Sequence, residues 1–346
     1  MKKFLIIQTA FTGDVILATS IIEKLKQYFP DSEIDFLLRK GNETLLENHP
    51  FLNRVIIWDK KQNKLSNLFR IISSVRKNKY DIVINLHRFA SSGLITALSG
   101  AKEKTGFDKN PFSFLFSKKV VHEIGSGKHE IERNHQLIKY LTDDIPAKPK
   151  LYPTGNDYAK AENVRTHFTE HRTSDSQLQE YICIAPASVW FTKQFPKVKW
   201  IELINKLPGE IRVYLLGSPE DTDLCEEIKS QIPASPASGS QLTSQIITNL
   251  SGKISFLESA ALMKGAKMNY VNDSAPLHIA SAMNAPVTAI YCSTIPAFGF
   301  GPLSDQSKIV ETNVTLDCRP CGLHGFKDCP KGHFKCALTI DVKDVL

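Results

Sequence analysis

Apolar runs of strand length alternate with helical patterns through the first half of the chain. The runs "KFLIIQT", "EIDFLLR", "RVIIWD" and "YDIVINLH" predict strands, and the spacing of apolar residues over 14–29, 42–48, 64–78 and 91–99 predicts helices between them. These strands are apolar along their whole length rather than at alternate positions, which is typical of a parallel sheet covered on both faces. The first half is therefore predicted to be a doubly wound α/β domain.

The pattern stops at "DDIPAKPKLYPTGND", where prolines and polar residues take over, and a charged helical stretch continues to about residue 171. It restarts with the runs "YICIAPAS", "RVYLLGS", "KMNYVND" and "PVTAIYC", and helices are predicted over 197–206, 220–231, 255–265 and 276–284. We therefore predict an N-terminal domain over 1–160 and a C-terminal domain over 175–346. Two such domains in series imply a cleft between them, and ligands of open α/β sheets bind beyond the carboxyl ends of the strands.

Length and charge narrow the range of partners. With 346 residues the chain can form two cores, and its 43 Lys and Arg residues exceed its 36 Asp and Glu residues, for a formal net charge of +7. The excess is spread out, apart from a denser basic region made of Lys60, Lys61, Lys64, Arg70, Arg76, Lys77 and Lys79. It favours an anionic small molecule or a membrane surface over a nucleic acid, although a solvated helix face explains these lysines equally well.

No targeting peptide and no run of eighteen apolar residues is visible in the sequence. We therefore expect a cytoplasmic protein. Three cysteines, Cys183, Cys225 and Cys292, stand singly in apolar or helical contexts and are expected to be small core residues.

The strand-to-helix loops lack the usual nucleotide motifs, since neither G-x-G-x-x-G nor G-x-x-x-x-G-K-[ST] occurs. This argues against an ordinary dehydrogenase or a P-loop hydrolase. Instead, the first loop carries Thr12-Gly13-Asp14. Asp14 has two interpretations, a helix N-cap or a general base at the rim of the cleft, and spacing alone does not separate them.

Two loops of the second domain offer groups that suit a nucleotide. In "APASVWFTKQFP", Ser188, Thr192 and Lys193 place two hydroxyls and an ammonium where a diphosphate could be held, although Lys193 taken singly fits an exposed lysine. In "LLGSPEDTD", Glu220 either complements the helix dipole or accepts the ribose hydroxyls of a nucleotide.

A further loop, "YVNDSAPLHIASAMNAP", passes from a strand into a helix at Asp273 and Ser274. Pro276 suits the first helical turn, and the exposed N–H groups between Ala275 and His278 would form an anion site. His278 could face the bound phosphate, although a lone helical histidine is more often packed or solvated.

Together these loops resemble glycosyltransferase family 9, the bacterial heptosyltransferases that build the inner core of lipopolysaccharide. The resemblance rests on "FTGDVILATSIIEKLKQYFPDSEIDFL", "YDIVINLHRFASSGLITALSGAKEKTGFD", "ICIAPASVWFTKQFPKVKWIELI" and "NDSAPLHIASAMNAPVTAIYCST". It implies a GT-B fold, with two Rossmann-like domains facing across a central cleft. It also implies inverting sugar transfer from a nucleotide sugar, ADP-heptose above all, to an anionic lipopolysaccharide acceptor, with no cofactor and no essential metal.

The resemblance also implies a role for each loop residue. Asp14 matches the catalytic base, and Arg88, which follows a strand in the first domain, is the best candidate to hold acceptor phosphates. The remaining matches are donor contacts in the second domain, namely Ser188, Lys193, Glu220, Asp273, Ser274, Ala275 and His278. The first domain would then bind the acceptor and the second the donor, with peripheral contact to the cytoplasmic face of the inner membrane.

Four cysteines near the end of the chain, Cys318, Cys321, Cys329 and Cys336, have the spacing C-x₂-C-x₇-C-x₆-C, with His324 and His333 between them. A tetrahedral zinc site, free thiols and a redox pair are all compatible with this pattern. The resemblance assigns these cysteines no role.

Two other functions stay open from the sequence. A nucleotide-sugar epimerase of GT-B architecture would need an acid and a base on opposite sides of one sugar. A non-catalytic nucleotide-sugar-binding module would keep the second domain, but it would have no use for Asp14 as a base.

Overall fold

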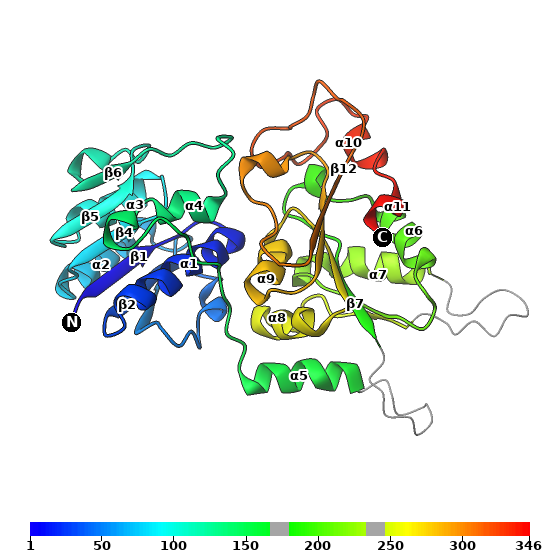
Figure 1. Cartoon of the computed structure of the whole chain (residues 1–346), viewed down its shortest axis with the longest axis horizontal. Coiled ribbons are helices and arrows are strands. Elements are labelled where there is room, and N and C mark those ends of the chain that lie inside the picture. Colours follow the sequence, from blue (N-terminus) through cyan, green and yellow to red (C-terminus); the bar gives the residue numbers. More distant parts are fainter. Residues whose placement is uncertain (167–179, 233–245) are drawn as a thin grey trace, which may run out of the picture. The chain divides into compact units, whose positions relative to one another are not determined.

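The protein is described here from a computed structural model, which describes residues 1–166, 180–232 and 246–346. It divides into two compact units, Met1–Tyr152 and Pro153–Leu346. Figure 1 shows the elements of each unit along the chain.

The N-terminal unit is built on a six-stranded parallel sheet of order β3-β2-β1-β4-β5-β6. Its strands are β1 (Lys3–Ile7), β2 (Glu33–Arg39), β3 (Arg54–Trp58), β4 (Ile82–Asn85), β5 (Glu103–Phe107) and β6 (Lys118–Val120). Its helices are α1 (Thr12–Tyr28), α2 (Lys64–Lys77), α3 (Ala90–Leu98) and the short α4 (Glu130–His135). The change of direction between β1 and β4 is the point at which doubly wound sheets bind ligands.

The C-terminal unit repeats this topology with the order β12-β11-β10-β7-β8-β9. Its strands are β7 (Tyr181–Ala185), β8 (Arg212–Leu215), β9 (Ile247–Asn249), β10 (Met268–Asn272), β11 (Val287–Tyr291) and β12 (Ser307–Glu311). Its helices are α5 (Gly155–Thr166), α6 (Lys197–Lys206), α7 (Thr222–Ser230), α8 (Phe256–Gly265), α9 (Ala275–Met283), α10 (Lys335–Leu338) and α11 (Val342–Val345). Both units are thus Rossmann-like, which confirms the predicted fold class.

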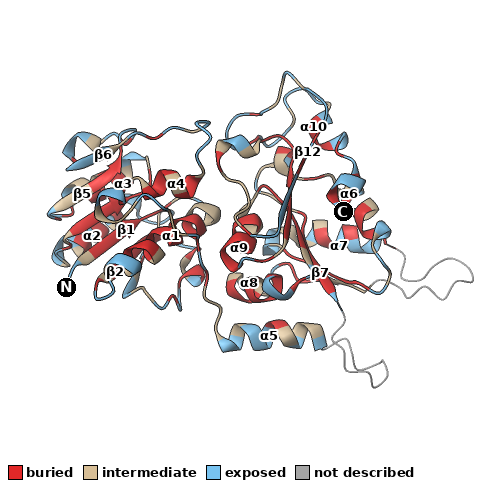
Figure 2. Cartoon of the chain, viewed as in Figure 1, coloured by how far each residue is buried: buried red, intermediate tan, exposed pale blue. Residues whose placement is uncertain are grey.

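Each sheet lies in its own apolar core, as the buried residues along the strands in Figure 2 show. In the N-terminal unit, β1 is buried along nearly its whole length, and Trp58 packs in the same core. In the C-terminal unit, Trp200 of α6 packs edge-on against Phe195, with ring centroids 5.1 Å apart. Cys183, Cys225 and Cys292 are buried in this second unit, which confirms them as small core residues.

The sequence pattern fails in two ways. The predicted helix over 42–48 is wrong, because the structure has only a 3₁₀ turn at Glu43–Leu45, and so short a segment does not stabilise an α-helix. The pattern also misses the inner strand β5, whose segment "EKTGF" begins with two charged residues, and the short helices α4, α10 and α11. It misses β6, β9 and β12 as well, which lie at sheet edges and are short or largely exposed. Edge strands of this kind lack the continuous apolar run that marks a central strand.

Helix α5 belongs with the C-terminal unit, so the division of the chain falls before residue 160. Lys160 of this helix pairs with Glu258 of α8 at 2.7 Å, and Ala161 is buried. The predicted helical stretch beyond residue 166 lies outside the described residues. Within the described ranges, no helix is long and apolar enough to cross a membrane.

Candidate functional site

Asp14 lies in the first turn of α1, directly beyond the carboxyl end of β1. Its Oδ2 atom accepts the backbone N–H of Phe11 at 3.1 Å, so Asp14 caps the helix from its third position and is not the N-cap residue itself. The side chain is half-buried. Asp14 therefore has the capping role that its position predicts.

Cations from three strand ends lie around this corner. Arg39 ends β2, Lys60 follows β3 and Arg88 follows β4. Because β3, β2, β1 and β4 are neighbours and parallel, their carboxyl ends meet at one edge of the sheet. Burial lowers the pKa of Arg39, and the negative charge of Asp14 opposes that shift. We call Arg39, Lys60 and Arg88 the cation group.

Lys60 is the most constrained member of the cation group. Its ammonium donates to the carbonyl oxygen of Thr9 at 3.0 Å and to the hydroxyl of Thr9 at 2.9 Å. Burial, together with the positive charges of Arg39 and Lys64, lowers the pKa of Lys60 to about 8. A bound anion would offset that repulsion.

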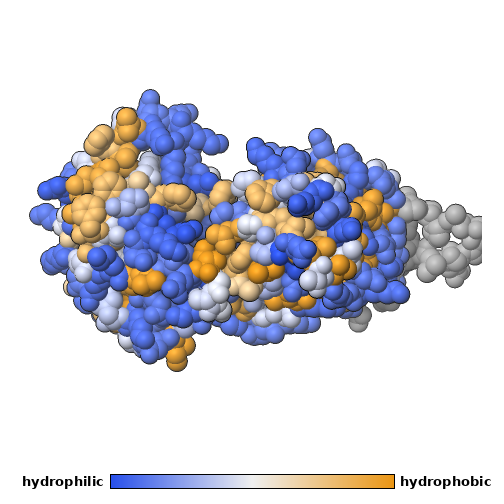
Figure 3. All heavy atoms as spheres, turned by 90° about the horizontal axis from the view of Figure 1, so that it is seen from above, coloured by the Kyte–Doolittle hydropathy of each residue, from blue (hydrophilic) through white to orange (hydrophobic). Residues whose placement is uncertain are grey.

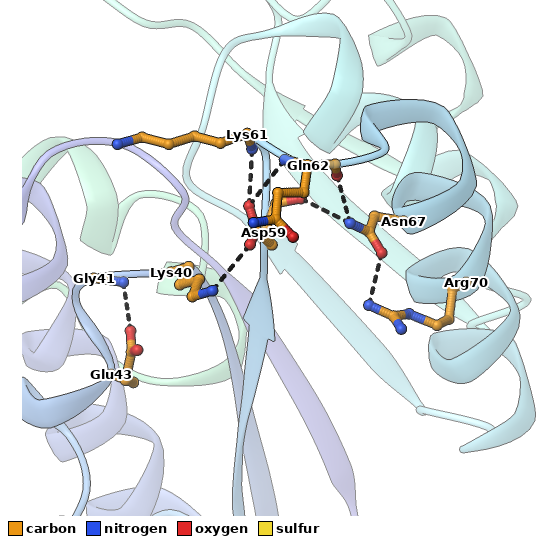
Figure 4. A network of polar contacts seen from close by, with 8 residues as sticks. All are labelled: Lys40, Gly41, Glu43, Asp59, Lys61, Gln62, Asn67 and Arg70. Atoms are coloured by element: carbon orange, nitrogen blue, oxygen red, sulfur yellow. Dashed lines mark hydrogen bonds and ion pairs between the residues drawn. The ribbon is translucent and has the colours of Figure 1, made fainter.

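The turn that carries Lys60 is fixed by the network in Figure 4. The Asp59 carboxylate accepts the backbone N–H groups of Lys61 (2.9 Å) and Gln62 (3.2 Å). Asn67 of α2 then donates to the Gln62 carbonyl at 2.6 Å and accepts from Arg70 at 2.7 Å, while the Lys61 ammonium points away from these contacts. The basic region is therefore divided: Lys60 is held against Thr9, whereas Lys61, Lys64 and Arg70 are exposed.

Two further titratable groups lie at this end of the sheet. His87, whose Nδ1 lies 3.0 Å from the Thr9 hydroxyl, has its pKa lowered to about 3 by burial and by the cation group, so its imidazole is neutral at pH 7. Glu130 of α4 is buried and bonded to Arg133 at 2.7 Å. Burial, with a smaller contribution from the charge of Asp14, raises the pKa of Glu130 to about 7 against the opposing effects of Arg133 and Arg88.

In the C-terminal unit the structure brings Lys193 and Asp273 together. The Lys193 Nζ atom lies 2.7 Å from Asp273 Oδ2, with the two side chains 14% and 8% exposed. The hydroxyl of Thr294 donates to the same carboxylate oxygen at 2.6 Å. Lys193 is therefore not an ordinary surface lysine, and its ammonium carries three donor hydrogens, one of which the contact with Asp273 uses.

Asn272 was not singled out from the sequence. Its Oδ1 atom accepts the backbone N–H of Phe195 at 2.8 Å, and its Nδ2 atom donates to the carbonyl of Pro186 at 2.8 Å. It thus ties the end of β10 to both ends of the loop that carries Ser188 and Lys193. The sequence signal that could have found Asn272 is a polar residue at the end of an apolar strand, because a buried polar side chain needs hydrogen-bond partners.

The other predicted donor residues occupy different settings. Ser274 is the N-cap of α9 and Ala275 begins the helix, both half-buried, with Pro276 in its first turn as predicted. His278 is buried, with its ring centroid 6.5 Å from that of Phe300. Glu220 is exposed in the 3₁₀ turn Pro219–Asp221. Ser188 is half-buried, and its carbonyl accepts from the Gln194 side chain at 2.7 Å.

The four C-terminal cysteines form no disulfide bond. Cys318 Sγ lies 3.8 Å from His333 Nε2, and Cys329 Sγ accepts the backbone N–H of Phe334 at 3.4 Å. In the described part of the chain, no group of three or more His, Cys, Asp or Glu side chains is arranged to hold a metal ion.

Two surface hollows of the N-terminal unit lie away from the predicted site residues. A hollow of about 510 Å³ in the N-terminal unit is lined by residues such as Glu23, Lys148 and Lys150, and another of about 310 Å³ is lined by residues such as Glu43 and His49. Neither is lined by a predicted site residue.

Two Rossmann-like units in one chain fit the GT-B architecture, and comparison with known proteins shows the family. The model of glycosyltransferase family 9 (heptosyltransferase) matches residues 68–324, and the chain belongs to this family. The family membership sets aside the epimerase and the non-catalytic module as alternatives.

Individual relatives extend the likeness over most of the chain. The lipopolysaccharide heptosyltransferase 3 of Escherichia coli is 28% identical over 295 residues, which cover 82% of each chain. Among solved structures, a family 9 glycosyltransferase from Veillonella parvula has a TM-score of 0.83 at 21% identity and covers 99% of this chain and 95% of its own. The E. coli heptosyltransferase WaaC with ADP-2-deoxy-2-fluoro heptose has a TM-score of 0.65 at 21% identity, covering 90% and 93%.

Proposed function

We propose that the protein transfers a heptosyl residue from ADP-heptose to the inner core of lipopolysaccharide, with inversion and without a divalent metal. The observation that carries the proposal is the division of chemistry between the units: a carboxylate among cations at one sheet edge, and a paired lysine beside a helix N-terminus at the other. The curated relative is a lipopolysaccharide heptosyltransferase, and WaaC was solved with an ADP-sugar. These names support the acceptor and the donor.

On the donor side, the diphosphate would bind at the N-terminus of α9, where Ser274 and Ala275 begin the helix. Free N–H groups and the helix dipole favour an anion there. The Lys193 ammonium would neutralise the charge that develops on the leaving diphosphate, in place of a metal. Glu220 would accept the ribose hydroxyls, Ser188 would add a hydroxyl contact, and His278 would face the phosphates.

On the acceptor side, Asp14 would remove the proton of the attacking hydroxyl as the anomeric carbon is attacked from the face opposite the diphosphate. Such a base contributes typically ~10²–10⁴-fold in rate. Arg88, with Arg39 and Lys60, would hold anionic groups of the acceptor, because charge-assisted contacts to phosphate or carboxylate are the strong ones. The acceptor would then be both bound and oriented by the residues that surround its base.

The cation group gives the acceptor site a pH dependence. The pKa of Lys60 is lowered to about 8, so its charge is lost as pH rises through that value rather than near 10.5. We expect the KM for the acceptor to rise roughly tenfold between pH 7 and 9, the order of one charge-assisted contact. Lys60→Arg, which stays protonated, should flatten the rise. An acceptor KM that is constant over this range, or that rises equally in Lys60→Arg, would contradict the assignment.

We also propose peripheral contact with an anionic membrane, through the segment of residues 109–121, which includes β6. Phe114 and Leu115 are 72% and 48% exposed there, among the exposed lysines Lys109, Lys118 and Lys119. Figure 3 shows apolar side chains gathered on the surface of the N-terminal unit, at the left of the view. Exposed apolar side chains among cations suit a lipid interface. Asn110 donates to the Phe89 carbonyl at 3.1 Å, so this segment adjoins the one that carries Arg88.

Sedimentation with vesicles that contain anionic lipid tests this contact. Replacing Phe114 and Leu115 by Ser should lower vesicle binding roughly tenfold, since two large apolar side chains lose their burial. The control replaces Ile145 and Val314, which are 69% and 46% exposed and lie outside the basic region, by Ser and should bind as wild type. An equal loss of vesicle binding in the two variants would contradict the assignment of this segment as the membrane contact.

The transferase proposal itself is tested by incubating purified, metal-stripped protein with ADP-heptose and a heptose-free lipopolysaccharide acceptor. The expected product is the acceptor extended by one heptosyl residue.

A further inference from the structure

The segment of residues 319–326, here called the strap, lies between Cys318 and Cys329 and contains Cys321. It packs against the loop that carries Lys193. Phe326 and Thr192 exchange hydrogen bonds: the Phe326 N–H donates to the Thr192 hydroxyl at 2.8 Å, and the Thr192 N–H donates to the Phe326 carbonyl at 3.1 Å. Thr192 is only 1% exposed and directly precedes Lys193. The strap therefore fixes the backbone from which the Lys193 side chain leaves.

The strap also binds residues 292–294, the loop that contacts Asp273, the ion-pair partner of Lys193. Arg319 donates to the carbonyls of Cys292 (2.8 Å) and Thr294 (2.7 Å), and the Cys321 N–H donates to the Ser293 carbonyl at 2.8 Å. Thr294 is the residue whose hydroxyl donates to Asp273. The Lys193–Asp273 pair is thus supported from both sides by one segment.

The two supported loops meet at a glycine of the strap. Gly325 has φ +76°, and a Cβ added there would lie 2.8 Å from the Thr192 hydroxyl oxygen, 3.1 Å from Lys193 Cγ and 3.2 Å from the Ser293 hydroxyl oxygen. The Ser293 hydroxyl itself donates to that of Thr192 at 3.0 Å. A side chain at position 325 would therefore push on the Lys193 loop directly.

We propose that the strap is a positioning element for the donor site, which sets the Lys193 ammonium against Asp273 for a nucleoside diphosphate. The positioning residues are Arg319 and Gly325 of the strap and Thr192 of the Lys193 loop. They act through Lys193 and do not contact the ligand. The inference rests on the proposed donor role of Lys193. The proposal gives the strap a function in glycosyl transfer.

The test compares Gly325→Ala with Gly332→Ala. Gly332 has φ +67°, nearly the same backbone conformation, but nothing lies within 4 Å of a Cβ added there. The strain of a side chain at positive φ is common to both variants, so their difference isolates the contact with the Lys193 loop. ADP binding to the full-length protein is measured by calorimetry, beside KM for donor and acceptor.

We expect Gly325→Ala to weaken ADP binding and raise the donor KM about tenfold or more, because displacing a binding group by a fraction of an ångström is costly. The acceptor KM should stay near wild type, and Gly332→Ala should bind ADP as wild type. Equal ADP affinity in the two variants would overturn the positioning role. Absence of ADP binding to the wild type would instead overturn the proposed function.

A second pair of variants covers the case in which Gly325→Ala does not fold. Thr192→Val keeps the shape of the side chain and removes the hydroxyl that accepts from Phe326. Its control is Thr312→Val, which removes a hydroxyl that likewise accepts a backbone N–H, that of Val314, at 3.1 Å. Weaker ADP binding in Thr192→Val alone supports the strap, and equal binding in both variants contradicts it.

Discussion

Asp14→Asn is expected to lower kcat by ~10²-fold or more while donor affinity and thermal midpoint stay close to wild type. The substitution keeps the shape of the side chain, and the amide oxygen can still accept the Phe11 N–H that Asp14 accepts at 3.1 Å. What it removes is the proton acceptor. Single-turnover transfer, ADP binding and thermal unfolding of the purified variant measure the three quantities separately.

If Asp14 acted only as a helix cap, Asp14→Asn would leave the transfer rate unchanged, since Asn caps helices about as well as Asp. Asp341→Asn is the matched control, because Asp341 is exposed and accepts the Lys343 N–H at 2.9 Å in the first turn of α11. It should be neutral in both rate and stability. Transfer by Asp14→Asn at the wild-type rate would show that the carboxylate is a structural cap only.

Lys193→Ala is expected to lower kcat/KM for the donor by roughly 10- to 100-fold, the effect of losing one charged contact to phosphate, with a much smaller change for the acceptor. It should also lower thermal stability, because Asp273, with its side chain 8% exposed, loses its ion-pair partner at 2.7 Å. The Thr294 hydroxyl still donates to that carboxylate, which limits the loss. Donor and acceptor kinetics are measured below the unfolding range of the variant.

Lys197→Ala provides the control for a lysine of the same region. Its ammonium pairs with Glu227 at 2.5 Å on the surface, where the two side chains are 34% and 57% exposed, and such pairs contribute little. We expect it to leave kinetics and stability unchanged. If Lys193→Ala keeps wild-type donor kinetics, the Lys193–Asp273 pair supports the fold of the unit and does not bind the diphosphate.

The central strands could be predicted from the sequence because burial on both faces leaves a continuous apolar run, as in β1 and β7. The edge strand β12 could not, since most of "SKIVE" is exposed and its pairing with β11 depends on residues elsewhere in the chain. Asp14 and Lys193 could be singled out because the sequence places each of them between an apolar strand and the helix that follows it. Their roles in transfer remain proposals.

The cation group left a signal that was used only for Arg88, which was singled out because it follows a strand. Arg39, Lys60 and Arg88 each stand at or just beyond the end of an apolar run, and parallel pairing brings such positions to one edge. The strap left no comparable signal, because Thr192 and Phe326 are 134 residues apart and neither is unusual for its segment. A contact of this kind follows from the tertiary fold alone.

Stereochemistry and metal dependence of the transfer test the central claim most directly. Purified protein, stripped of metal with a chelator, is given ADP-heptose and a heptose-free lipopolysaccharide acceptor, and the product is analysed by mass spectrometry and by NMR of its anomeric proton. We expect one heptosyl residue to be added with inverted anomeric configuration and at the same rate as in the presence of magnesium. Retention of configuration, or transfer that returns only when magnesium or manganese is restored to the folded protein, would contradict an Asp14-based, metal-free displacement.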